Sequence, residues 1–178
     1  FIVTQGERMG ITESCPAPMP AEGETMVDVI GERIRAYQKD EKGIDLSGFS
    51  NHEMLLLHQY NIFPNLTVLI SADLLQVLSA RPGATADTSE LIGMSFEREI
   101  KDVPRARPFD LDMPADQAGF GFVLNQDVDI LKNAQRGVNQ PGLTHISLSC
   151  EEARVVNTHR NLEHYLGIEP SEITGGPA

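Results

Sequence analysis

The sequence contains very little cysteine. Cys15 and Cys150 are its only two cysteines, and they stand far apart in the chain. Neither belongs to a Cys-x-x-Cys pair, and neither has a histidine two residues later. A disulfide-stapled domain needs a denser set of paired cysteines. We therefore expect a protein without structural disulfides, from a reducing, cytoplasmic compartment.

Long hydrophobic runs are also absent. No apolar segment approaches the ~20 residues that a membrane-spanning helix needs. The chain opens with Phe1-Ile2-Val3, without an initiator methionine and without a basic stretch ahead of an apolar one, so we do not expect these residues to be a signal peptide. We expect a cut inside a longer protein, and no membrane partner.

Basic residues are outnumbered by acidic ones. The 14 lysines and arginines against 26 aspartates and glutamates give a net charge of −12. This charge has the wrong sign for binding a phosphate backbone, so a nucleic-acid partner is excluded, whereas it suits solubility or a basic protein partner. The apolar content of 40% and the length of 178 residues predict a single globular domain over residues 1–178.

The N-terminal part predicts a connector followed by one helix. Pro16, Pro18 and Pro20 remove backbone donors and disfavour both helix and sheet, so residues 1–23 are expected to be an irregular, extended connector. From Thr25 to Lys39 the apolar residues recur near helical spacing, which predicts a helix.

Four strand-like runs follow, joined by short connections. The predicted strands are Met54–Ile62, Leu66–Ser71, Leu74–Ala80 and Glu90–Ile100. Consecutive strands with short links favour an antiparallel meander over parallel βαβ units. The proline-containing stretch from Asp102 to Pro114 is expected to be a surface loop.

Two helices are predicted between Asn125 and Leu166. Ser149 precedes Glu152 by three residues, the spacing of a capping box at a helix start. The residues that then recur near helical period, and so predict one buried face, are Val155, Val156, Leu162, Tyr165 and Leu166. Residues 169–178 are predicted to be a flexible tail. An antiparallel sheet followed by a long C-terminal helix makes the fold class α+β.

The spacing of a few residues carries a family resemblance. Asp127 is followed eight residues later by Gln135, then by Gly137, then by the Ser-x-x-Glu helix with Tyr165 near its end. This set resembles the C-terminal catalytic domain of the large (alpha) subunit of Rieske non-haem iron aromatic-ring-hydroxylating dioxygenases. The likeness extends back to Phe63-Pro64-Asn65 and covers roughly two thirds of the chain. It implies a helix-grip fold, in which an antiparallel sheet wraps the C-terminal helix and a ligand lies between them.

The resemblance also implies an activity and its partners. The parent enzyme would be an oxidoreductase of aromatic hydrocarbon catabolism that inserts oxygen from O₂ into an aromatic or similarly apolar substrate at a mononuclear Fe(II). Electrons would come indirectly from NAD(P)H, through a reductase, often a ferredoxin, and a [2Fe–2S] Rieske cluster. Such large subunits form trimers, in some members with a β subunit. The cluster needs two cysteines and two histidines, in Cys-x-His pairs of an N-terminal domain that we expect to be missing here.

By the same resemblance Asp127 is the carboxylate ligand of the iron, in a set of two histidines and one carboxylate. From the residues alone, Asp127 also fits an aspartate near a helix start, where the macrodipole favours an acid. We expect Asp127 to be buried. Asp129 is the competing acid, but its spacing to Gln135 is wrong and it should be solvated. Val123, one helical turn before Asp127, is a candidate for the substrate pocket.

The histidine ligands are not recognisable. The family supplies them from an Asp-x-x-His-x-x-x-x-His stretch upstream of the acid, and no such stretch occurs. His52 and His58 would share one face of a predicted strand, but too far apart to bind one ion. His145, His159 and His164 fit no better, although His159 is expected near the pocket side, with a hydrogen bond in the core. We expect both ligands before Phe1, so that this chain alone is inactive.

A second interpretation belongs to another functional class. Helix-grip domains also serve as non-catalytic carriers of apolar ligands. A carrier needs no histidine pair, so the absence of that pair is what this interpretation predicts. The sequence upstream of Phe1 would discriminate between the two.

Overall fold

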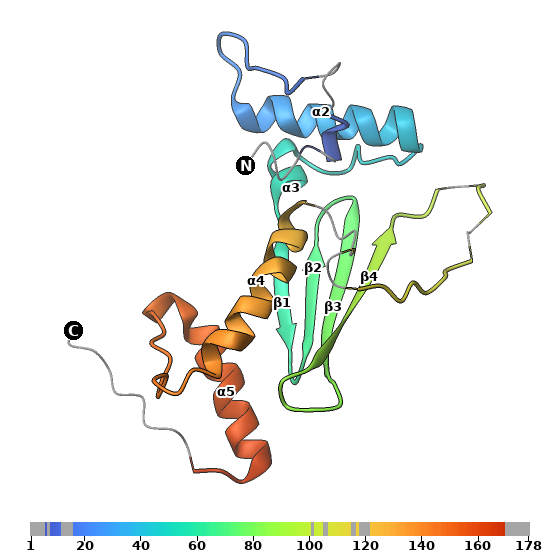
Figure 1. Cartoon of the computed structure of the whole chain (residues 1–178). Helices are drawn as coiled ribbons and strands as arrows, with labels where there is room; N and C mark the ends of the chain where they lie inside the picture. The colour runs from blue at the N-terminus through green and yellow to red at the C-terminus, as the bar shows by residue number, and fades with distance from the viewer. Residues whose placement is uncertain are drawn as a thin grey trace.

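The computed structural model describes residues 6, 8–11, 16–100, 102–104, 107–114, 117 and 122–169, and over 122–124 it describes the backbone alone. The helices are α2 (Met26–Lys42), α3 (Asn51–Leu55), α4 (Phe122–Val138) and α5 (Ala153–Leu166), with the 3₁₀ turn η2 (Cys150–Glu152) before α5. The strands are β1 (His58–Ile62), β2 (Leu66–Ile70), β3 (Leu74–Pro82) and β4 (Ser89–Glu97). Figure 1 shows α2 and α3 at one end of the sheet and α5 at the other.

The four strands form one antiparallel sheet in the order β1-β2-β3-β4. The predicted meander is therefore confirmed, and so is the α+β class. The register places Tyr60, Val68, Val77 and Met94 in one row across the sheet. Because paired residues share a face, this row makes one face of the sheet apolar at its centre.

The helix α2 has a clear signal at each end. At its start the Thr25 side chain accepts a hydrogen bond from the Asp28 backbone, and the Asp28 carboxylate accepts one from the Thr25 backbone. The hydrogen bonds from Thr25 and Asn51 lower the pKa of the Asp28 carboxyl below its ordinary value. At its end Gly43 adopts the left-handed conformation with φ 70° and donates to the Lys39 carbonyl. The helix runs to Lys42, beyond the predicted end.

The start of the first predicted strand is wrong. Residues 51–55 form the helix α3 instead, and β1 begins only at His58. The physical reason is a capping box: the Ser50 backbone donates to the Glu53 carboxylate at 2.8 Å, and the Glu53 backbone donates to the Ser50 hydroxyl at 3.3 Å. This is the same Ser-x-x-Glu signal that predicted the helix after Ser149.

The hydrophobic core lies around α2 and α3. Its buried members are Met9, Ile30, Ile34, Ile44, Leu46, Met54 and Ala72. Within the stretch predicted as a connector, Arg8 and Met9 are helical and Met9 is fully buried, whereas residues 16–20 have no regular structure. The N-terminal segment therefore takes part in the core.

The predicted buried face of α5 is wrong. No residue of α5 is buried, and Tyr165 is 75% exposed. The Tyr165 ring packs on Phe63, in the turn after β1, with ring centroids 5.0 Å apart. In the part of the chain that the structure describes, α5 thus extends past the end of the sheet and is not wrapped by it.

The close approach of α2 to α3 predicts the effect of one substitution. A Cβ on Gly31 would lie 2.8 Å from both Cα and Cβ of Asn51. Gly31→Ala should therefore lower the free energy of unfolding by about 1–3 kcal/mol through overpacking, although alanine is the better helix former. Gly48→Ala is the matched control, since no atom of the described residues lies within 4 Å of its Cβ position. Urea unfolding compares the two; a Gly31→Ala protein as stable as the wild type would contradict the packing argument.

Candidate metal centre

Asp127 lies in the second turn of α4 and its side chain is exposed. The prediction of a buried acid is wrong. The next residue, Val128, is the buried one, with an exposed fraction of 7%. Successive side chains of a helix point about 100° apart, so a helix that turns Val128 inward turns Asp127 toward solvent. Because α4 begins at Phe122, Asp127 is not at the helix start either.

The exposed carboxylate of Asp127 has no hydrogen bond or ion pair to any described residue. Nor do the described residues bring three or more histidine, cysteine, aspartate or glutamate side chains together where a metal ion could bind. A mononuclear iron of the predicted kind needs two imidazoles beside the acid. The described residues therefore do not form an iron site, and offer one candidate ligand for it. Asp129, the competing acid, is exposed as expected.

The histidines are all exposed, and they are spread over α3, β1, the loop before η2, and α5. His52 is in α3 and not in a strand, and His58 opens β1, so the two do not share a strand face. His145 lies in the loop before η2, with its Nδ1 3.0 Å from the Thr144 hydroxyl. His159 and His164 lie on α5, and the core hydrogen bond expected for His159 is wrong because that side chain is exposed.

The other residues that the sequence singles out are Val123, Gln135 and Gly137. Val123 lies in the first turn of α4, where the structure describes no side chains, so its place in a pocket falls outside the described residues. A Cβ on Gly137 would meet nothing within 4 Å among them. Gln135 is partly buried, and its amide donates to the Asp87 carboxylate at 3.3 Å. No local signal in the sequence marks Asp87, which lies 48 residues before Gln135.

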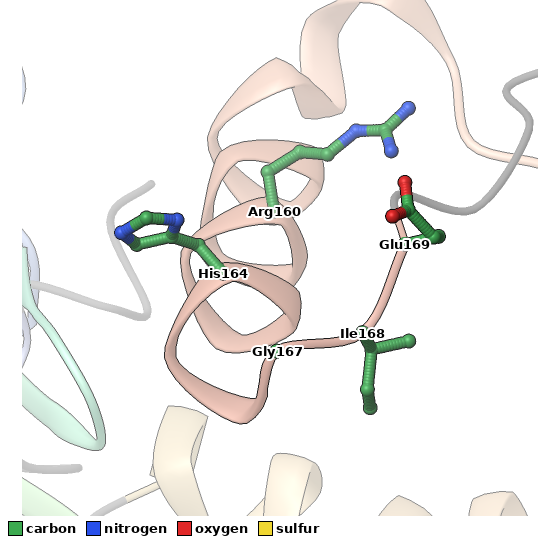
Figure 2. Close-up of a pocket in the computed structure, with 5 residues that line it drawn as sticks. All are labelled: Arg160, His164, Gly167, Ile168 and Glu169. Carbon is green, nitrogen blue, oxygen red and sulfur yellow. The ribbon is translucent and has the colours of Figure 1, made fainter.

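A cavity of about 300 Å³ lies at the C-terminal end of α5. It is lined by Arg160, His164, Gly167, Ile168 and Glu169. Figure 2 shows the Arg160 guanidinium and the Glu169 carboxylate pointing toward each other, while His164 leaves the helix on another side. The ion pair that Arg160 forms is with the Glu163 carboxylate, at 3.2 Å. None of the described residues that line this polar hollow lies on a strand, so it is not the predicted apolar cavity between the sheet and the last helix.

Comparison with known proteins gives one match. The family model described as ring hydroxylating alpha subunit (catalytic domain) matches residues 7–168. Searches of curated proteins and of solved structures found no match. Within the described residues, no helix combines the length and the hydropathy needed to cross a membrane.

Proposed function

Since the chain belongs to the ring-hydroxylating alpha subunit family, as part of its catalytic domain, we propose that it carries the carboxylate ligand of a mononuclear Fe(II) oxygenase site. The match over residues 7–168 is the observation that carries this proposal. The family consists of oxidoreductase catalytic domains, and membership implies a mononuclear iron in the parent enzyme. The proposed reaction is the insertion of oxygen from O₂ into an aromatic or similarly apolar substrate, for which bound iron supplies the activation of O₂.

Asp127 is the proposed ligand. The spacing of Asp127 to Gln135 and Gly137, which resembles the family pattern, supports this assignment. Its exposed carboxylate, without a partner among the described residues, is available to a metal. Because those residues offer no histidine pair, we place the two imidazole ligands before Phe1, on the Asp-x-x-His-x-x-x-x-His stretch of the parent protein.

The substrate site is proposed on the apolar face of the sheet. The row of Tyr60, Val68, Val77 and Met94 supports this, since small-molecule sites are mostly apolar and concave. We propose that the complete domain closes this face in the helix-grip manner, with Val123 at the pocket. The partners proposed with it are a [2Fe–2S] Rieske domain, a ferredoxin or reductase that delivers electrons from NAD(P)H, and further large subunits in a cytoplasmic trimer, with or without a β subunit.

Iron binding tests the proposal. The chain of residues 1–178, purified without oxygen and mixed with Fe(II), should retain far less than stoichiometric iron and form no product, because one carboxylate makes a weak site. The parent protein with its upstream residues should retain iron and hydroxylate an apolar aromatic substrate. Tight binding of stoichiometric iron by the short chain would show that it holds a full ligand set. This result would contradict the proposal that the two histidine ligands lie before Phe1.

A carrier of apolar ligands is the second candidate. It is favoured by the absence, among the described residues, of three side chains that could bind a metal together. A parent protein that binds an apolar aromatic compound in a 1:1 ratio, yet retains no iron and forms no product, would establish the carrier instead.

A further inference from the structure

We propose that Asp87, in the turn between β3 and β4, holds the C-terminal half of α4 on the sheet and thereby positions the helix that carries Asp127. The attachment itself does not depend on the proposed function; its consequence for Asp127 does. This gives Gln135, which the family pattern singles out, a positioning role rather than a role as a ligand.

One side chain in α4 and one just after its last residue both donate to a single carboxylate oxygen. Asp87 Oδ1 accepts hydrogen bonds from Gln135 Nε2 at 3.3 Å and from Asn139 Nδ2 at 2.9 Å. Residues four apart share one face of a helix, so both amides reach the same point. Hydrogen bonds to an ionised acceptor are stronger than those between neutral groups. One acid thus links two elements that are about 50 residues apart in sequence.

The turn that presents Asp87 is itself cross-linked. The Gly83 backbone donates to the Thr88 carbonyl at 2.9 Å, and the Thr85 backbone donates to the Thr88 hydroxyl at 3.0 Å. The Thr88 hydroxyl in turn donates to the Thr85 carbonyl at 3.1 Å. A Cβ on Gly83 would lie 2.8 Å from the Thr88 carbonyl oxygen, so the turn closes this tightly only with glycine. These contacts fix the backbone on both sides of Asp87.

The face of α4 that meets this turn also carries the helix's buried residue. Among the described side chains of α4, Val128 alone is buried. Gln135 follows Val128 by seven residues, which is about two turns or roughly 10 Å along the same face. Val128 and the Asp87 contact therefore lie on the same face of α4. Two hydrogen bonds to one carboxylate restrict the rotation of this face, and that rotation decides where Asp127 points.

The test compares variants of the chain by amide hydrogen exchange over residues 131–138. Asp87→Ala should raise the exchange rates about 3- to 10-fold, the effect of losing one to two net hydrogen bonds. Asp87→Asn keeps an oxygen acceptor at the same place and should restore most of the protection. Asp129→Ala, an exposed acid on the same helix, should leave the rates unchanged. Unchanged exchange in Asp87→Ala, or strictly additive effects of Asp87→Ala and Asn139→Ala in a double-mutant cycle, would overturn the attachment.

The positioning role is tested in the parent enzyme. Asp87→Ala should lower the iron retained per protein, and Asp87→Asn should restore it. If exchange rises but iron retention stays at the wild-type level, Asp87 is an anchor of α4 and not a positioning residue, and that part of the inference fails. A failure of the proposed function is recognised separately: Asp127→Ala would then retain iron, whatever the exchange rates of the Asp87 variants.

Discussion

Asp127→Ala in the parent enzyme is expected to remove bound iron and turnover together. The loss should exceed the roughly 10- to 100-fold that follows removal of a partner merely orienting a ligand, because the ligand itself is gone. Iron content after desalting and product formation under single-turnover conditions measure the two effects. The fold should be unharmed, since Asp127 is exposed and has no partner among the described residues.

Asp129→Ala is the matched control for this prediction. Asp129 lies on the same helix, two residues on, and is also exposed. Alanine favours the helix at both positions, so neither replacement should destabilise α4. If Asp129→Ala loses iron while Asp127→Ala keeps it, the ligand assignment is wrong by two residues. If both keep it, this helix carries no iron ligand and the carrier interpretation becomes the better one.

Local signals in the sequence account for most of the described fold. The four strands, the meander and the helix after Ser149 follow from alternation, short links and capping chemistry. The helix α3 was missed because it is only five residues long and its Ser50–Glu53 cap stands at the edge of a strand-like run. A short capped turn and a strand start can share the same apolar residues. In such a case the cap decides, because it satisfies backbone donors that a strand would leave free.

Burial and long-range contacts could not be predicted in the same way. The periodic face of α5 shows that a side is available to pack, but periodicity does not say what covers it, and Leu162 and Leu166 are exposed. The family spacing predicts Asp127 as the iron ligand, whereas the exposure of its side chain depends on the rotation of α4. That rotation is tied to Asp87, 40 residues earlier in the chain. A single sequence contains no local trace of such a pair.

The buried ion pair of Arg8 and Asp73 predicts the largest effect on stability. Asp73 is 5% exposed, and its carboxylate accepts from Arg8 Nε at 2.9 and 3.1 Å, from Gln38 Nε2 at 3.2 Å and from the Ser71 hydroxyl at 3.0 Å. Asp73→Ala removes the acceptor of all three donors and leaves the Arg8 charge in a largely buried place. We expect the free energy of unfolding to fall by about 3–5 kcal/mol, a large share of the ~5–15 kcal/mol typical of a domain. In urea unfolding, this loss should appear as a lower midpoint concentration, with an unchanged dependence of the free energy of unfolding on urea concentration.

Two further variants distinguish the possible causes of that loss in the free energy of unfolding. Glu97→Ala breaks the exposed ion pair with Lys42, whose atoms lie 3.1 Å apart, and should change the free energy of unfolding by no more than ~1 kcal/mol. The double replacement of Arg8 by methionine and Asp73 by leucine removes both charges and keeps apolar volume beside Met54 and Ala72, so it should recover most of the stability. Recovery assigns the cost of Asp73→Ala to the Arg8 charge that has lost the Asp73 carboxylate. If the double variant is no more stable than Asp73→Ala, the cost comes from the lost hydrogen bonds of Gln38 and Ser71, since these stay broken in both proteins. An Asp73→Ala effect no larger than that of Glu97→Ala would contradict the prediction, because the N-terminal segment would then be held by Met9 in the core and not by the ion pair.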